Sequence, residues 1–363
     1  MLKTAGTASG RVVGARLPLI DGVEKVTGRA KYTADLITPD TLTGRIFRSP
    51  YSHGKILKLD ISKAAALPGV IAVVTNEDAP VPFGMIPISE NEYLLAKDRV
   101  RFKGDAVAAV AAINDQVAAE AIGLIELEVE ELPAYFDAES ARAPDAVDIH
   151  EDRPGNLERE VHWELGDIEG AFEQADVICE DTFRCPEISH GQMEPNASVA
   201  EYDPIKEHLT LYSSTQTPYY VHLALAQTLS MSKSQLRVVK PFIGGGFGAR
   251  TMPFNSELIT ALLARAANGK VALKMNREET FLTRGGRPET EMKLKVAATK
   301  EGRLLACECE AVQRGHGAVN VRFAFEVILD MIAEELGIDP FEIRRQNLLS
   351  APTETINGVK IDS

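Results

Sequence analysis

The sequence predicts an α+β protein of two domains joined by a linker. Short stretches with the alternation typical of strands are interspersed with stretches whose apolar residues recur at helical spacing. With 363 residues, the chain is long enough for two hydrophobic cores. Residues 134–159 are rich in Ala, Pro, Asp and Glu and lack any periodicity. We therefore expect a lead-in at 1–19, domains at 20–133 and 160–363, and a linker at 134–159.

The elements of the first domain follow from local patterns. Strands are expected at 43–48, 70–74, 106–113 and 125–130, and helices at 62–67 and 116–124. The stretch 106–113 is almost entirely apolar, which is typical of a strand covered on both faces. Asp115 stands at the expected N-cap of the second helix. The first domain should therefore contain a well-buried sheet.

The second domain is expected to contain more helix. Strands are predicted at 177–183, 197–202, 209–213, 235–239 and 271–275, and helices at 167–175, 217–229, 253–267, 318–336 and 340–349. A hairpin is predicted from 289–299 and 303–312, with its turn at 300–302.

Composition and charge exclude several classes of protein. The chain has 39 Lys+Arg and 53 Asp+Glu, and its net charge of −14 opposes non-specific binding to nucleic acid. No apolar stretch approaches the roughly 20 residues of a membrane span, and the first ten residues lack the apolar core of a signal peptide. We therefore expect a cytoplasmic protein that does not bind nucleic acid and has no membrane span.

The four cysteines do not predict a metal site. Cys179, Cys185, Cys307 and Cys309 form no Cys-x-x-Cys pair, and their spacing fits neither a zinc site nor an iron–sulfur site. We interpret them as reduced cysteines that pack as small apolar groups. The chain is therefore expected to carry no metal cluster of its own.

The stretch Lys240-Pro-Phe-Ile-Gly-Gly-Gly-Phe-Gly-Ala-Arg250 lies between the expected strand 235–239 and the expected helix 253–267. Glycines allow positive φ values and let the backbone approach a ligand closely. The N–H groups at the start of the following helix favour an anion such as phosphate. This stretch therefore predicts a site for a phosphorylated or otherwise anionic ligand.

A nicotinamide or flavin site is an alternative for the same glycines. Gly244-x-Gly246-x-x-Ala249 fits the dinucleotide-binding pattern. However, the next strand ends at Asn276-Arg277 without an acidic residue for a ribose, and a hairpin follows in place of further βαβ units. No Gly-Lys-Ser/Thr follows the glycines, which excludes a nucleotide-triphosphatase loop. The dinucleotide interpretation is therefore the weaker one.

Several stretches resemble the large subunit of the xanthine oxidase family of molybdenum hydroxylases. They are Val26-Thr-Gly-Arg-Ala-Lys-Tyr-Thr-Ala-Asp35, Met193-Glu-Pro-Asn-Ala197, Ser214-Thr-Gln-Thr-Pro218, Gly244-Gly-Gly-Phe-Gly-Ala-Arg250 and Arg314-Gly-His-Gly317. Within the family, residues 82–93 and 216–222 are most similar to the molybdenum subunit of 4-hydroxybenzoyl-CoA reductase. The resemblance implies an α/β-hammerhead-like N-terminal domain followed by the first half of a molybdopterin-binding domain.

The resemblance also implies a cofactor and its binding residues. Gln216 matches the glutamine whose amide hydrogen-bonds an oxygen on molybdenum, and Phe247 and Gly248 match residues whose backbone N–H groups lie beside the metal. Arg314 matches an arginine near the pterin. The cofactor-binding set is Gly244, Gly245, Gly246, Phe247, Gly248 and Arg314. In the family a pterin dithiolene holds the metal without a protein thiolate, and in many bacterial members the pterin carries a cytidine dinucleotide. FAD and [2Fe-2S] clusters are expected on flavin and iron–sulfur partner subunits.

The candidate substrate-binding residues are Arg250, Thr251 and His316. Thr251 stands where xanthine-type members carry a glutamate, and His316 stands where they carry an aromatic residue. These differences favour an aromatic CoA thioester over a purine. The implied reaction is the reductive removal of an aromatic hydroxyl. The alternatives are oxidative hydroxylation of a purine, an aldehyde or another aromatic, and a non-catalytic remnant. We interpret His190 and Glu194 as structural, although their spacing is i,i+4.

Members of the family are longer than this chain. Their C-terminal half supplies further cofactor contacts and a glutamate that acts as general base. They also carry an additional stretch between the strand matching 303–312 and the Arg314-Gly-His-Gly317 element. The resemblance therefore implies a truncated and internally shortened subunit, and we expect this chain alone not to turn over substrate.

Overall fold

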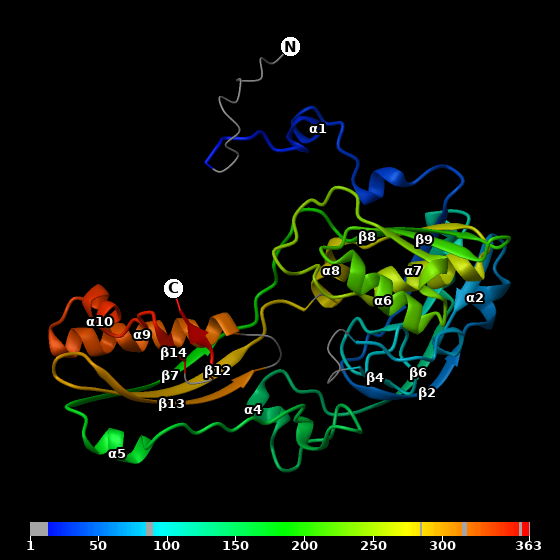
Figure 1. Cartoon of the computed structure of the whole chain (residues 1–363). Helices are drawn as coiled ribbons and strands as arrows, with labels where there is room; N and C mark the ends of the chain where they lie inside the picture. The colour runs from blue at the N-terminus through cyan, green and yellow to red at the C-terminus, as the bar shows by residue number, and fades with distance from the viewer. Residues whose placement is uncertain (1–13, 85–89, 284, 314–317, 356–357, 363) are drawn as a thin grey trace.

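The computed structural model describes residues 14–84, 90–283, 285–313, 318–355 and 358–362. Two sheets with separate cores dominate the molecule (Figure 1). A seven-stranded sheet is covered by helices on both faces, and a three-stranded sheet carries the long helix near the C-terminal end on one face, with a shorter helix packed on that one. The glycine stretch belongs to the part of the chain that contains the larger sheet.

The seven-stranded sheet has the order β10-β9-β8-β11-β1-β5-β3. Its strands are β1 (Leu42–Arg48), β3 (Val70–Val74), β5 (Ala106–Ala112), β8 (Ala197–Asp203), β9 (His208–Ser213), β10 (Leu236–Val239) and β11 (Lys270–Lys274). In its middle β1 runs parallel to β11 and pairs Leu42 with Val271. Strands from both sides of the expected linker 134–159 therefore share one sheet.

Strand β5 separates two cores, which explains its apolar sequence. All seven of its residues are buried, and it lies antiparallel between β1 and β3. Ala109 and Ala111 face the core of α7 (Asn255–Ala266), whereas Ala108 and Val110 face that of α3 (Asp115–Gly123). The expectation that this strand is covered on both faces is confirmed.

The N-terminus of α3 differs from the prediction by one residue. The Asn114 side chain accepts the Val117 N–H at 2.9 Å, so Asn114 is the N-cap. Asp115 begins the helix, and its carboxylate pairs with Arg45 at 2.8 Å. The prediction of Asp115 as N-cap was therefore wrong, because both residues are good caps and the local pattern does not choose between them.

The three-stranded sheet has the order β13-β12-β7 and contains the predicted hairpin. Its strands are β7 (Val177–Cys185), β12 (Thr290–Ala298) and β13 (Leu304–Gln313). The helices α9 (Ala318–Leu336) and α10 (Pro340–Gln346) belong to the same core, in which Met292 and Leu294 meet Ile328 and Ile332. The predicted hairpin and the two final helices are confirmed.

The cysteines differ in their environments. Cys179 is buried beside Glu335, and burial together with that carboxylate raises the pKa of its thiol to about 11. Cys307 and Cys309 are exposed on the edge strand β13. The expectation of packed cysteines is wrong for these two, because α9 packs on β7 and β12 rather than on the edge. Among the described residues, no group of three or more His, Cys, Asp or Glu could hold a metal ion.

The other strands and α-helices have the following bounds. They are β2 (Gly54–Asp60), β4 (Arg99–Val100), β6 (Glu126–Glu131), β14 (Thr353–Glu354), β15 (Lys360–Ile361), α1 (Gly22–Val26), α2 (Ser62–Ala66), α4 (Ala138–Ala141), α5 (Ile168–Glu173), α6 (Pro218–Thr228) and α8 (Arg277–Thr283). The helix α8 was not predicted from the sequence. None of the helices in the described ranges has the length and apolar character needed to cross a bilayer.

Asp105, just before β5, should make stability depend on pH. Burial raises the pKa of its carboxyl from 3.8 to about 6, and burial and Asp105 also raise the pKa of Glu92. The folded state therefore binds the proton more tightly than the unfolded state. This contribution to stability is complete below pH 3.8 and is lost as the pH rises to about 6. The shift corresponds to a loss of roughly 2–3 kcal/mol.

We expect Asp105→Asn to remove most of this pH dependence. The amide oxygen of asparagine can still accept the Arg101 N–H, which lies 3.1 Å from Asp105 Oδ2. Urea unfolding at pH 4.5 and pH 7 measures the effect. The wild-type chain should lose more stability over this interval than the variant. Parallel pH profiles for the two proteins would contradict the assignment.

Candidate functional site

The glycine stretch does not lead directly into a helix. It follows β10, and residues 251–254 separate it from Asn255, where α7 begins. We predicted that the N-terminal N–H groups of that helix would favour an anion at the glycines, and the structure does not show this arrangement. Local turns intervene because the loop folds back on itself, with hydrogen bonds from Ala249 N to Gly246 O and from Thr251 N to Gly248 O.

Two of the glycines are required by neighbouring side chains. A Cβ on Gly244 would lie 2.6 Å from the Glu194 Cβ, and a Cβ on Gly246 would lie 2.5 Å from Gln216 Oε1. Gly245 and Gly248 instead need their positive φ values of 102° and 93°. The protein therefore packs against one side of this loop. The glycines are needed for this packing and for the backbone conformation, and not only to give a ligand access.

Gln216 is fixed in its orientation by the loop. Its Oε1 accepts the N–H groups of Gly248 at 3.1 Å and Arg250 at 3.3 Å. Its own backbone N–H donates to Arg250 O at 2.8 Å. Because both partners of the side-chain oxygen are N–H donors, the oxygen and not the nitrogen must face them. The NH2 group of Gln216 thus remains available to donate to a ligand.

Three consecutive backbone N–H groups in the loop have no acceptor within the described residues. They belong to Gly245, Gly246 and Phe247. Phe247 has a φ of 52°, in the left-handed region, and its side chain is 74% exposed. Successive N–H groups in such turns form concave sites for anions. The N–H group of Gly248, which was also predicted to lie beside the metal, differs from these three because it already donates to Gln216 Oε1.

Arg250 is buried inside the protein in an ion pair. Its side chain is fully buried, and one guanidinium nitrogen lies 2.6 Å from Glu194 Oε2 and 3.2 Å from Ser214 O. The prediction of a substrate contact is therefore not supported, because a buried guanidinium needs the partners that this one already has. The interpretation of Glu194 as structural agrees with this ion pair, although its partner was not anticipated.

The structure gives no support for a substrate contact by the other candidate substrate residues, Thr251 and His316. The Thr251 hydroxyl donates to Gly248 O at 2.8 Å, so it serves the loop itself. Arg314 and His316 lie outside the described residues.

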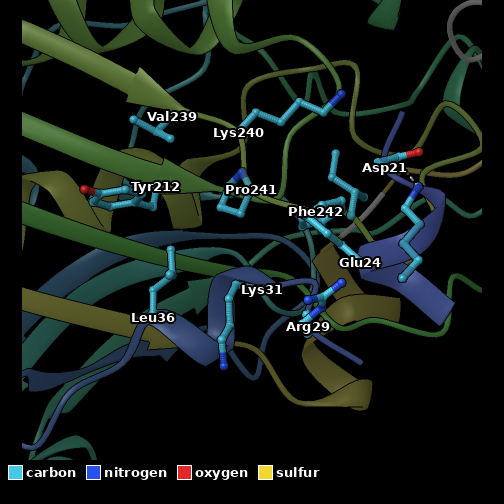
Figure 2. A pocket seen from close by; sticks show the side chains of 12 residues that line it. Asp21, Glu24, Arg29, Lys31, Leu36, Tyr212, Val239, Lys240, Pro241 and Phe242 are labelled. Atoms are coloured by element: carbon cyan, nitrogen blue, oxygen red, sulfur yellow. Dashed lines mark ion pairs between the residues drawn. The ribbon is translucent and has the colours of Figure 1, made fainter. Parts of the chain in front are cut away.

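A cavity of about 750 Å³ lies at the start of the same stretch (Figure 2). Its lining includes Lys240, Phe242, Arg29 and Lys31, and the last two lie in the segment between α1 and β1. Lys25 also lines it, pairs with Asp21 at 2.5 Å and lies 5.8 Å from the centre of the Phe242 ring. The basic groups here are on the surface and are accompanied by carboxylates, and the sequence patterns did not reveal this cavity.

The donors around the glycine loop fit an oxygen-rich, anionic cofactor such as a molybdopterin. The three N–H groups of residues 245–247 and the NH2 group of Gln216 are all donors. The amide nitrogen of Gln192, a residue only 2% exposed, is also buried without a partner among the described atoms. A set of donors without matching acceptors is what a phosphate-bearing or oxo-bearing group would require.

Family models match nearly the whole chain. Residues 27–133 match "Aldehyde oxidase and xanthine dehydrogenase, a/b hammerhead domain", and residues 149–314 and 310–348 match "Molybdopterin cofactor-binding domain". The predicted order of a hammerhead-like domain followed by a molybdopterin-binding domain is therefore confirmed.

Curated relatives agree with these matches. The chain is 37% identical over 300 residues to the nicotinate dehydrogenase large molybdopterin subunit of Eubacterium barkeri, covering 83% of this chain and 70% of that protein. It is 30% identical over 384 residues to the xanthine dehydrogenase molybdenum-binding subunit of Escherichia coli O157:H7, covering 90% of this chain and 51% of that protein.

Solved structures resemble the fold along almost the entire chain. The aldehyde oxidoreductase from Desulfovibrio gigas superimposes with a TM-score of 0.85 at 28% identity, covering 97% of this chain and 45% of that one. Quinoline 2-oxidoreductase from Pseudomonas putida 86 superimposes with a TM-score of 0.86 at 26% identity, covering 94% of this chain and 51% of that one. The chain thus spans about half the length of these proteins.

Proposed function

The chain belongs to the xanthine oxidase family of molybdenum-dependent oxidoreductases, as a molybdopterin-binding large subunit, and from this premise we propose that its glycine loop and Gln216 hold the cofactor. The observation that carries the proposal is the set of N–H donors at residues 245–247, which have no acceptor in the described part of the chain and lie beside the Gln216 carboxamide. In this proposal the bound cofactor supplies the metal centre for oxidation or reduction of the substrate.

The residues of this chain bind and orient the cofactor in this proposal. The N–H groups of Gly245, Gly246 and Phe247 receive anionic oxygens, and the Gln216 NH2 group donates to an oxygen near the metal. Gly244 and Gly248 shape the loop, since their N–H groups already bond Glu194 and Gln216. Arg314 is kept in the proposal as a residue near the pterin, on its sequence resemblance alone. A cytidine dinucleotide form of the cofactor, flavin and iron–sulfur partner subunits and a cytoplasmic location are part of the same proposal.

For the substrate we propose an aromatic or heteroaromatic ring. The relative at 37% identity is named for nicotinate, which supports oxidation of a nitrogen heteroaromatic acid as the first candidate. The second candidate is reductive removal of the hydroxyl from 4-hydroxybenzoyl-CoA, which rests on the resemblance of residues 82–93 and 216–222. Support for a CoA thioester is weakened because Arg250 is fully buried and the Thr251 hydroxyl already donates its proton to Gly248 O.

The substrate class can be tested on the complex purified from its native host. We expect kcat/KM for nicotinate or 4-hydroxybenzoyl-CoA to exceed that for xanthine by at least about 100-fold, because a site with matched polar groups rejects an analogue strongly. Whichever aromatic compound reacts faster selects between the two candidates. Equal values for xanthine and both aromatic compounds would refute the proposed substrate class.

A further inference from the structure

We propose that Glu194 is a positioning residue that sets the shape of the glycine loop through Arg250 and thereby orients Gln216. This inference rests on the proposed function, because the loop and Gln216 are the cofactor-binding elements there. Glu194 was not among the site residues predicted from the sequence.

Glu194 contacts the first glycine of the loop directly. Its Oε2 accepts the Gly244 N–H at 2.8 Å, and its own N–H donates to Gly244 O at 3.3 Å. The space that a Gly244 side chain would need is occupied by the Glu194 Cβ. The side chain of Glu194 is only 14% exposed, so these bonds are sheltered from competing water.

Arg250 transmits this contact to the other end of the loop. Its guanidinium shares the same Oε2 of Glu194 at 2.6 Å, while its main chain makes two bonds to Gln216. The Gln216 side chain in turn holds the Gly248 N–H. Gly244 and Gly248 are therefore both held by side chains. The N–H groups of residues 245–247, which have no acceptor within the described ranges, lie between these two fixed points.

A carboxylate suits this position better than an amide. Oε2 receives one backbone N–H and one guanidinium donor, and bonds to an ionised acceptor are about twice as strong as neutral ones. Neutralising Glu194 would leave the fully buried Arg250 without its counter-charge. The loop would then lose its hold on Gly244 and, through Arg250, on Gln216.

Amide hydrogen exchange on the full chain without cofactor tests the inference. In Glu194→Gln the protected amides of Gly244, Gly248 and Arg250 should exchange at least ten-fold faster than in the wild type. Glu194→Asp keeps the charge and should restore most of the protection. The matched control is Glu279→Gln, which breaks the largely buried pair of Arg48 and Glu279 at 2.9 Å but does not touch the loop. Exchange at residues 244–250 should be unchanged in that control.

Two results would overturn the inference. One is unchanged loop exchange in Glu194→Gln, and the other is equal acceleration in the loop and in β7 and β12, which would make Glu194 a general stabilising residue. If Glu194→Gln does not fold, Arg250→Lys provides the same measurement with the charge retained, and it should accelerate loop exchange with the other strands unaffected.

A second readout separates this inference from the proposed function. Pterin content per chain in the wild type tests cofactor binding itself, and the exchange experiment needs no cofactor. A wild type that never carries pterin would reject the proposed function, while the exchange data would still decide the role of Glu194. If the wild type does carry pterin, Glu194→Gln should retain at least ten-fold less after dialysis and Glu279→Gln should retain the wild-type amount.

Discussion

Replacing Gly246 with valine is expected to lower the molybdopterin content of the purified chain at least ten-fold. A Cβ at this position would lie 2.5 Å from Gln216 Oε1 and 2.6 Å from its Cδ, so the carboxamide must leave its place. Its departure also removes the acceptor of the Gly248 and Arg250 N–H groups. Pterin fluorescence after oxidation and molybdenum analysis, both per mole of chain, measure the result.

A glycine with free space supplies the control for that experiment. Gly123 lies at the end of α3, and a Cβ there would meet no atom within 4 Å. Gly123→Val should therefore carry the wild-type amount of pterin. Equal pterin content in Gly246→Val and the wild type would show that the glycine loop does not hold the cofactor.

Arg250→Ala is expected to destabilise the protein by about 3–5 kcal/mol, because it leaves the carboxylate of Glu194 largely buried without its partner. The substitution also removes the guanidinium nitrogen of Arg250 that donates to Ser214 O at 3.2 Å in the wild type. The urea midpoint of unfolding, compared with that of the wild type, measures the loss. Activity is a poor readout for this variant, since the expected effect is on folding and not on substrate contact.

An exposed arginine in an ion pair is the appropriate comparison. Arg345 pairs with Glu342 at 2.6 Å, but its side chain is 71% exposed, so Arg345→Ala should cost below about 1 kcal/mol. Suppose instead that Arg250→Ala is as mild as Arg345→Ala and raises KM for the substrate. Arg250 would then be a substrate contact and not a structural residue.

Local periodicity predicted most of the helices and strands. The apolar stretch of β5 and the hairpin of β12 and β13 were recognised because each depends on residues that are close in sequence. The helix α8 was missed because its seven residues, Arg277–Thr283, are too few for a helical repeat to be distinguished from a turn. The edge cysteines were misjudged because exposure depends on which strands a distant helix covers.

The candidate site was predicted only in part. The glycine stretch and Gln216 were chosen from sequence patterns and a family resemblance, and the structure brings them together through the bond from Gly248 N to Gln216 Oε1. The assignment of Arg250 to substrate was reasonable for an arginine at the end of a glycine-rich loop. Its burial could not be anticipated, because nothing in the local sequence shows that a carboxylate 56 residues away will lie against it.

Short stretches of residues were sufficient to predict the α+β class and most of the helices and strands, and their resemblance to a known family indicated the kind of cofactor. The folded structure was needed to show that β1 pairs with β11 across the linker, that Glu194 and Arg250 are buried together, and which loop N–H groups have no acceptor among the described residues. The physical reason is that strand pairing and charge burial depend on the packing of distant segments. A hydrogen bond or an ion pair forms between whichever groups packing brings within reach, and no periodicity along the chain encodes that distance.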